Sequence, residues 1–180
     1  MCDAHVGLDI SELWRTFLGV EVRITMKAKR RAAKNIMDTG FVQYASLIWR
    51  RTEQSALEVL LVTSRDTGRW VMPKGWPMKG KKPHEAAAQE ALEEAGVIGL
   101  VQSKPYGHFI YFKRRASYFD VVRVDVFLLE YKSQALKWRE SEMRQQLWTS
   151  PMDAANLVEE PGLRALLEKF NKDKIALLPS

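Results

Sequence analysis

The sequence predicts an α/β fold in which helices pack on a mixed β-sheet. Several apolar runs have the length of strands, one well-bounded segment has the pattern of a helix, and two helical segments follow near the end. These elements do not alternate in a strict βαβ rhythm, which argues against a purely parallel sheet. With 180 residues the chain suits one domain and a modest extension, and we place that domain at residues 41–171.

The first half of this domain contains three expected strands and a helix. Residues 42–49 and 57–63 are rich in apolar side chains and are separated by a polar turn, so both are predicted as strands. A shorter strand is expected at 70–72, where a proline follows. Residues 83–95 have the pattern of a helix that begins with proline and is ended by Gly96.

The second half continues with strands and closes with helices. Two long β-like segments are expected at 102–113 and 118–131, followed by a short strand at 145–148. Residues 151–157 and 161–171 are predicted as helices. Strands and helices therefore occur throughout the domain, as a sandwich with a mixed sheet requires.

The ends of the chain differ from the domain between them. Residues 1–40 form an N-terminal extension with a short expected helix at 9–19 and a basic arm at 27–34, which holds five cations. Such an arm is either a solvated surface segment or a segment that binds an anion, and both interpretations stay open. Residues 172–180 are expected to be a C-terminal tail.

Composition limits the classes of function. The formal charge of +6, from 28 Lys and Arg against 22 Asp and Glu, favours an anionic partner such as a polyphosphate or a nucleic acid, although solubility alone also explains it. The single cysteine, Cys2, excludes an intramolecular disulfide, and no Cys/His cluster has the spacing of zinc ligands. No apolar run is long enough for a bilayer span, and no signal peptide is evident, so we expect a cytoplasmic protein without a membrane partner.

The predicted helix 83–95 carries the most informative side chains. Glu90, Glu93 and Glu94 are spaced i, i+3, i+4 and share one face. The opposite face is expected to be apolar, with Ala88, Ala91, Leu92 and Ala95. Like charges on one exposed face repel by roughly 0.2–0.5 kcal/mol per pair, so the cluster is either a solvated acidic face or a site for a hard cation such as Mg²⁺.

The segment from Gly75 to Val97 resembles the Nudix box, G-x5-E-x7-R-E-U-x-E-E-x-G-U, in which U is aliphatic. Gly75, the three glutamates, Gly96 and Val97 all fall at the required offsets, and Ala91 is a small residue at the first U. The resemblance implies an α/β/α sandwich that hydrolyses phosphorus-containing anhydrides with Mg²⁺, or Mn²⁺ in its place. It implies Glu90, Glu93 and Glu94 as metal ligands, with Glu93 and Glu94 as the catalytic pair.

Two positions depart from the box. Lys81 stands where the family has a glutamate, and Gln89 stands where it has an arginine that resembles an orienting residue for the glutamates. Glu85, in the first turn of the helix, is the candidate to replace the missing glutamate. The general base is expected among the three box glutamates or at Glu140 or Glu142.

The substrate is expected to be a small phosphorylated molecule. Residues 73–75 and 93–97 resemble the diadenosine-polyphosphate and diphosphoinositol-polyphosphate branch of the family. Residues 42–44 lack the basic side chains that are expected there in an enzyme acting on diphosphoinositol polyphosphates, so a dinucleoside polyphosphate is at least as well supported as the substrate. Five cations near the box and in a later turn are expected to bind substrate or to be solvated: Lys74, Lys79, Lys81, Lys82 and Arg115. The aromatic residues are predicted to be mainly core, with stacking on a base as the alternative: Trp70, Trp76, Tyr106, Phe109 and Tyr111.

Two further functions remain open at this point. The departures at Lys81 and Gln89 favour a catalytically weakened domain that senses a phosphorylated ligand. The basic balance alone favours an enzyme that removes pyrophosphate from the 5′ end of RNA. Metal-dependent turnover distinguishes an enzyme from a sensor.

Overall fold

The computed structural model describes residues 41–114 and 116–175. The first half contains β1 (Val42–Arg51), β2 (Leu57–Thr63), β3 (Trp70–Val71), β4 (Lys74–Gly75) and α3 (Pro83–Ala95). The second half contains β5 (Val97–Val101), β6 (Gly107–Arg114), β7 (Phe119–Gln134), β8 (Gln146–Thr149), α4 (Pro151–Leu157) and α5 (Pro161–Ile175). The N-terminal extension, its basic arm and Arg115 lie outside the described residues.

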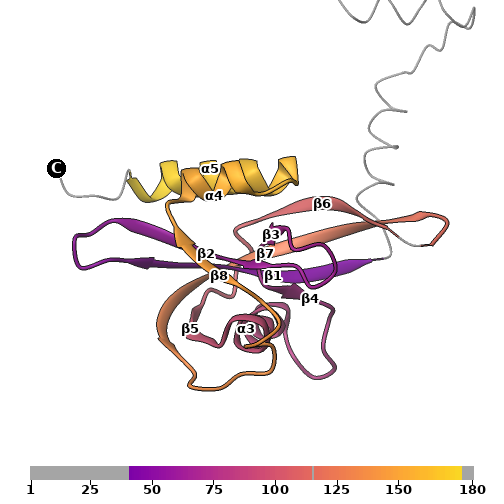
Figure 1. Cartoon of the computed structure of the whole chain (residues 1–180), viewed down its shortest axis with the longest axis horizontal. Coiled ribbons are helices and arrows are strands. Elements are labelled where there is room, and N and C mark those ends of the chain that lie inside the picture. The colour runs from indigo at the N-terminus through magenta and orange to yellow at the C-terminus, as the bar shows by residue number, and fades with distance from the viewer. Residues whose placement is uncertain (1–40, 115, 176–180) are drawn as a thin grey trace, which may run out of the picture. The chain divides into compact units, whose positions relative to one another are not determined.

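The eight strands of the described chain form one mixed sheet, which confirms the predicted fold class (Figure 1). Along its main path the order is β3-β2-β1-β7-β5, with β8 beside β2 and β6 beside β7. β1 and β7 pair in parallel, from Val42 opposite Arg123 to Trp49 opposite Glu130, and all other pairs are antiparallel. The short β4 pairs with β1 at Tyr44 and Ala45, which fixes the start of the box against the centre of the sheet.

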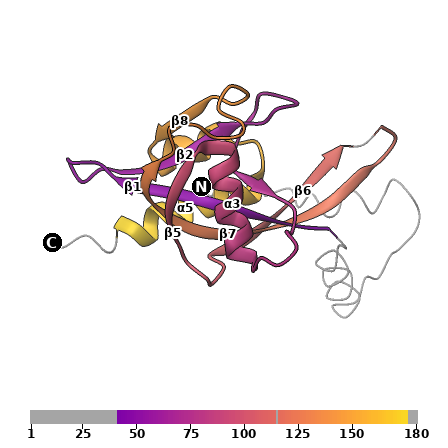
Figure 2. The same cartoon turned by 90° about the horizontal axis from the view of Figure 1, so that it is seen from below.

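Helices cover both faces of the sheet. α4 and α5 pack on one face, and α3 lies across the other, as the two views show (Figures 1 and 2). Each face has its own buried cluster: one includes Phe109, Leu163 and Phe170, and the other includes Ile48 and Ala91. The molecule is therefore the three-layered sandwich that the box implied.

Several element boundaries differ from those expected from the sequence, most of all at the start of β6 and at the end of α5. The strand expected at 102–113 begins only at Gly107, and residues 97–101 form β5, which the sequence pattern did not indicate. β5 lies at the edge of the sheet and alternates in burial: Val97 is buried and Val101 packs on the core, whereas Ile98 and Leu100 are 50% and 62% exposed. The last helix also runs to residue 175, four residues into the expected tail.

None of the helices within 41–114 and 116–175 combines the length and the apolar character needed to cross a bilayer.

Candidate active site

Helix α3 begins and ends as the sequence predicts. Pro83 occupies its first turn, and the backbone N–H of Lys82 donates to the Glu85 carboxylate at 2.8 Å. At the other end, Gly96 has a φ of 68° and its N–H donates to the Leu92 carbonyl at 2.9 Å. The glutamates of the box are thus held on a helix with two defined ends.

The side of α3 that meets the sheet is built from small residues. Ala87, Ala91 and Ala95 are fully buried, and the Ser46 hydroxyl on β1 donates to the Ala87 carbonyl at 2.8 Å. The expected apolar face is correct at Ala91 and Ala95, but the contact with the sheet is shifted by part of a turn toward Ala87. As a result Ala88 and Leu92 are only half-buried. Glu94, expected on the face opposite the apolar one, is 7% exposed at the edge of the contact beside β4.

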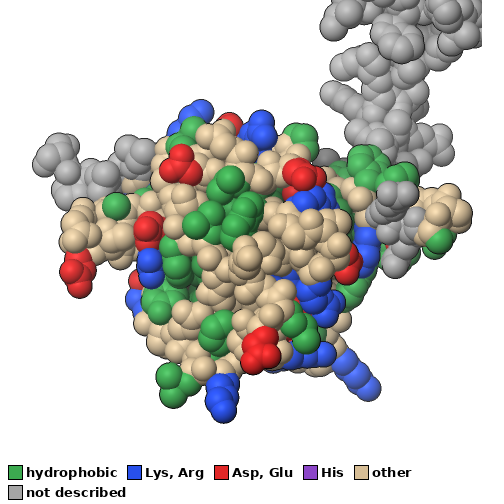
Figure 3. Space-filling model, in the orientation of Figure 1, with side chains coloured by type: hydrophobic (Ala, Val, Ile, Leu, Met, Phe, Trp, Pro, Cys, Tyr) green, Lys and Arg blue, Asp and Glu red, His purple; other side chains and the backbone are tan. Residues whose placement is uncertain are grey.

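A cleft of about 900 Å³ opens along the acidic side of α3. Its walls come from α3, β4, the β2–β3 loop, the β6–β7 hairpin and the β7–β8 loop. Figure 3 shows Lys and Arg side chains on the right of the face that it presents. The acids that line the cleft are Asp66, Glu90, Glu93, Glu94 and Glu140, and the cations are Arg65, Arg69, Lys74, Lys113, Arg139 and Arg144.

Glu90 lies against the first residue of the box. A Cβ added to Gly75 would lie 1.9 Å from Glu90 Oε1, so glycine at this position leaves room for the carboxylate. Burial, together with repulsion from Glu94, Glu93 and Glu140, raises the pKa of Glu90 to about 7. No residue within 41–114 and 116–175 donates a hydrogen bond to this carboxylate.

Glu94 is held by two donors. Its Oε1 accepts from Arg144 Nη2 at 2.5 Å, and its Oε2 accepts from the backbone N–H of Lys74 at 3.2 Å. Burial raises the pKa of Glu94, while the charges of Arg144 and Lys74 act in the opposite direction. Glu90 and Glu94 therefore both lie at the Lys74–Gly75 strand, as expected for carboxylates that share one site.

Glu93 has a different environment. Gln89 Nε2 donates to Oε1 at 2.9 Å, and Arg139 Nη1 donates to Oε2 at 2.7 Å. Its side chain is 24% exposed and faces the cleft from the outer side of α3. The neutral Gln89 thus contacts one of the box glutamates, but a charged partner for Glu93 comes from another loop.

Among the described residues, no three His, Cys, Asp or Glu side chains are arranged to hold a metal ion by themselves. Mg²⁺ in proteins is commonly held by one or two carboxylates, with substrate phosphates and water completing its coordination. Glu90 is desolvated, lacks a donor and is repelled by three acids, so a nearby divalent cation would stabilise its ionised form. The donor set at Glu90 and Glu94 fits such a cation.

The five cations expected to bind substrate occupy different places. Lys74 lines the cleft with Nζ 5.7 Å from the Tyr111 ring centre, and burial lowers its pKa. Lys79, Lys81 and Lys82 are exposed on the turn before α3 and do not line the cleft. Arg115 lies outside the described residues. Glu85 caps α3 and does not line the cleft, so it does not replace the missing box glutamate.

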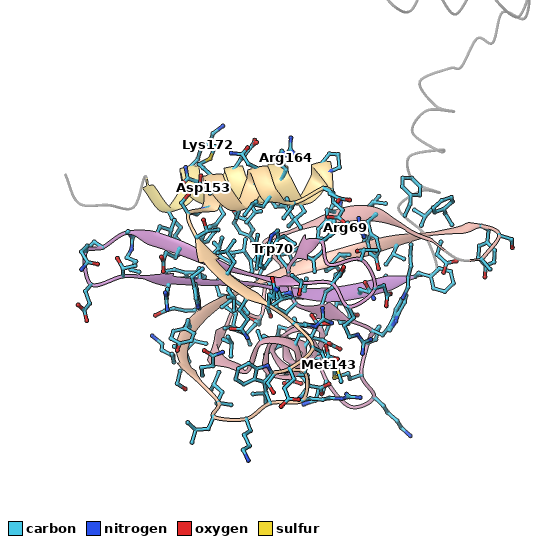
Figure 4. The ribbon with its side chains drawn as sticks, in the orientation of Figure 1. Arg69, Trp70, Met143, Asp153, Arg164 and Lys172 are labelled. Atoms are coloured by element: carbon cyan, nitrogen blue, oxygen red, sulfur yellow. The ribbon has the colours of Figure 1, made fainter. Side chains whose placement is uncertain are left out.

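No motif in the sequence indicated the arginines that line the cleft. Arg65 and Arg69, the second of which is labelled in Figure 4, come from the β2–β3 loop. Arg69 Nη1 lies 2.9 Å from Glu159 Oε2. Arg139 and Arg144 come from the β7–β8 loop. Their only signal in the sequence is that both follow a long strand and lie near Glu140, which was a candidate base.

The two candidate bases outside the box are not equivalent. Glu140 lines the cleft but is 8% exposed, with Arg144 Nε 2.6 Å from its Oε2 and Arg65 Nη1 3.3 Å from its Oε1. Glu142 lines a smaller depression beside Met143 instead. Of these two, only Glu140 can contact a molecule in the cleft.

The aromatic residues divide into core and rim. Phe109 is buried, and Trp70, Tyr106 and Tyr111 pack against the same cluster, as the sequence predicted; Trp70 lies between the sheet and the two C-terminal helices (Figure 4). Trp76 is 36% exposed and lines the cleft together with Phe112 and Phe119, which are 68% and 61% exposed. Lys113 Nζ lies 5.2 Å from the Trp76 ring centre. The rim thus offers aromatic faces beside cations.

Known proteins are similar to this chain in sequence and in fold. The family model described as "NUDIX domain" matches residues 42–170. "Nudix hydrolase 13, mitochondrial" of Arabidopsis thaliana is 29% identical over 127 residues, which cover 65% of this chain and 61% of that protein. "Diphosphoinositol polyphosphate phosphohydrolase 3-alpha" of Mus musculus is 28% identical over 149 residues, 81% of this chain and 87% of that protein. A solved binary complex of the C. elegans Ap4A hydrolase superposes with a TM-score of 0.58 at 20% identity, covering 76% of this chain and 99% of that one.

Proposed function

Since its residues 42–170 show that the chain belongs to the Nudix family, we propose that it hydrolyses a phosphoanhydride bond in a polyphosphorylated small molecule, with Mg²⁺ as cofactor. The matched segment spans under two thirds of Nudix hydrolase 13, so the activity is inferred from the site. The observation that carries the proposal is the pairing of Glu90 and Glu94 at the Lys74–Gly75 strand. The Glu90 carboxylate has no hydrogen-bond donor among the described residues, and the Glu94 carboxylate is oriented by two hydrogen-bond donors.

The residues of the site have separate proposed roles. Glu90 and Glu94 would hold the metal ion, with Glu93 beside them as the third acid of the box. When bound, the ion would neutralise phosphate charge and make water a better nucleophile. We assign proton transfer to Glu93 first, because its carboxylate is the more open one of the catalytic pair, while Glu94 orients the site.

Phosphate binding is assigned to cations of the cleft walls. Lys74, Arg65 and Arg69 line the cleft from two neighbouring segments and can contact adjacent phosphates of one chain. Lys79, Lys81 and Lys82 stay proposed contacts only for a substrate long enough to extend beyond the cleft.

The rim favours a substrate that carries a planar ring. Trp76, Phe112 and Phe119 expose their rings at the cleft, and such rings stack on nucleobases by roughly 1–3 kcal/mol per base. An inositol ring has no aromatic face to stack. A dinucleoside polyphosphate is therefore the first proposed substrate and a diphosphoinositol polyphosphate the second.

A ligand-sensing domain is the second candidate function. It is favoured by the pairing of Glu93 and Glu94 with arginines, which leaves only Glu90 without a charged partner among the described acids of the box. A sensor would bind the same phosphorylated ligands without turnover.

The test is a screen for phosphate or pyrophosphate release with and without Mg²⁺. The panel comprises dinucleoside polyphosphates, diphosphoinositols, nucleotide sugars and RNA with a 5′-triphosphate. We expect Mg²⁺-dependent release from the first group and a loss of about 100-fold or more in Glu94→Gln, as removal of one electrostatic group typically costs. If the protein binds these ligands but hydrolyses none of them, it is a sensor. If it releases pyrophosphate only from RNA, it is an RNA 5′-pyrophosphohydrolase.

We also propose that the protein acts in the cytoplasm. The Arabidopsis relative named above is described as mitochondrial, so fluorescence microscopy of a fusion at the C-terminus would separate the two compartments.

A further inference from the structure

The acidic face of α3 lacks a cation of its own. The helix has no basic residue in its last turn, and the box position expected to carry an arginine is Gln89. Gln89 donates one neutral hydrogen bond to Glu93 and none to Glu94. Three carboxylates thus need orientation from elsewhere in the molecule.

The β7–β8 loop supplies two guanidinium groups to this face. Each of the three guanidinium nitrogens of Arg144 donates a hydrogen bond. Nη2 donates to Glu94 at 2.5 Å, Nε donates to Glu140 at 2.6 Å, and Nη1 donates to the carbonyl of Thr63 at 2.7 Å. Its side chain is only 6% exposed. Arg139 is 74% exposed and bonds Glu93.

The loop itself is attached to α3 and its C-cap. The backbone N–H of Ala135 donates to the Gly96 carbonyl at 2.8 Å, and the N–H of Glu140 donates to the Glu93 carbonyl at 3.1 Å. The positions of both arginines are therefore fixed relative to the helix that carries the glutamates.

We propose that Arg144 and Arg139 are positioning residues that together replace the missing arginine of the box. Arg144 sets the orientation of Glu94, and Arg139 sets that of Glu93. This inference rests on the proposed metal-dependent function, and it explains how the site can tolerate Gln89.

Orientation and charge predict opposite effects on metal binding, which makes the inference testable. A positive charge beside a carboxylate repels a divalent cation, so loss of an arginine that acts only by charge tightens metal binding. Loss of an arginine that orients a ligand weakens metal binding, and groups that orient metal ligands typically contribute roughly 10–100-fold in affinity.

The experiment measures Mn²⁺ binding by electron paramagnetic resonance of the full chain. Arg139→Gln is the first variant, because an exposed residue can be changed with little effect on folding. Arg139→Gln with Gln89→Arg returns a guanidinium to the helix, four residues before Glu93. Arg144→Lys keeps the buried charge but loses the planar three-sided donor set. Arg50→Gln removes a matched Arg–Glu pair, with Glu58, on strands away from the cleft.

We expect the Kd of Mn²⁺ to rise about 10-fold in Arg139→Gln and in Arg144→Lys, to return toward wild type in the double variant, and to stay unchanged in Arg50→Gln. The inference is overturned if the Kd of Mn²⁺ is unchanged or lower in both Arg139→Gln and Arg144→Lys, or if the double variant shows no recovery. Turnover of the substrate panel is measured in parallel. A wild type that binds Mn²⁺ with this pattern but turns over no substrate overturns the proposed function alone, and a wild type that binds no Mn²⁺ overturns both.

Discussion

The helices that cover the two faces of the sheet bury different kinds of side chain. On the face covered by α4 and α5, large apolar residues such as Phe170, Leu163 and Leu167 are fully buried. On the face covered by α3, the helix contributes alanines to the contact and carries its acids beside them. Burial of large side chains contributes most of the hydrophobic stabilisation. Helix α5 therefore contributes more hydrophobic stabilisation than α3, and the small side chains of α3 let a charged helix lie close to the sheet.

The largest expected effect tests the apolar face. Phe170→Ala should lower the free energy of unfolding by about 3–5 kcal/mol, because a fully buried ring leaves a cavity. Urea unfolding measures this change. The Kd of Mn²⁺ for the folded fraction should match wild type, and a large change in that Kd would show that the two faces are not independent.

A smaller effect is expected at the contact between the strand and the acidic helix. Gly75→Ala places a methyl group where the Glu90 carboxylate lies, so the carboxylate has to move while the backbone stays. We expect Mn²⁺ affinity and turnover to fall about 10-fold, as for other groups that orient a ligand, with a small change in melting temperature.

Gly80→Ala is the control for this change. Gly80 has a φ of 79°, and nothing lies within 4 Å of an added Cβ. That variant should lose stability through backbone strain of about 1 kcal/mol without loss of Mn²⁺ affinity. Equal losses of affinity in both variants would mean that loop strain, and not the clash with Glu90, controls the site.

The acidic face should also lower the stability of the metal-free protein at alkaline pH. Glu90 has a pKa of about 7 in the folded protein, above the usual value of 4.5, so the folded state binds its proton more tightly. The resulting stability is present at low pH and is lost as pH rises through 7. Glu90→Gln should therefore raise the free energy of unfolding at about pH 8 by on the order of 1 kcal/mol, after allowance for solvent screening.

Thermal unfolding in a chelator at about pH 5 and pH 8 measures this effect. Glu53→Gln, at an exposed position in the turn after β1, is the matched control. If Glu90→Gln and Glu53→Gln change the melting temperature equally at both pH values, Glu90 is not destabilised by its surroundings.

The smallest effect is expected at Lys81. Because its side chain is exposed and outside the cleft lining, Lys81→Glu should raise KM by about two-fold or less at low salt, and only for the longest polyphosphates. At physiological ionic strength, screening over about 8 Å should remove the difference. Steady-state kinetics at two salt concentrations would check this, and a larger rise that survives salt would place Lys81 at the substrate.

Local patterns in the sequence predicted the elements that have strong boundaries. Helix α3 has proline at its start and glycine at its end, and its residues 83–95 were placed correctly. The edge strand β5 was missed because its solvent-facing residues, Ile98 and Leu100, are as apolar as its buried Val97, so the sequence does not show the alternation in burial. The mixed sheet followed from the order of elements, but the parallel pairing of β1 with β7 is a tertiary choice that no local pattern records.

The acids of the candidate site and Lys74 were predicted from the sequence, whereas its arginines were not. Spacing identified Glu90, Glu93 and Glu94, because helical periodicity places them on one side. The same periodicity placed Glu94 on the face opposite the apolar one, since it could not show that β4 and Arg144 would cover this carboxylate. Arg139 and Arg144 belong to an irregular loop, where residue spacing does not determine position.

The parallel pairing of β1 with β7 also sets the order in which the site can be assembled during synthesis. β1 emerges first, yet its parallel partner follows only after the box, β5 and β6 have been made. Contacts between such distant segments form late and slow folding, because the intervening chain loses entropy when it is closed into a loop. Helix α3 therefore leaves the ribosome before β7, the strand that completes its support. A nascent chain halted before residue 119 should lack the finished cleft, since β7 and both positioning arginines are still missing.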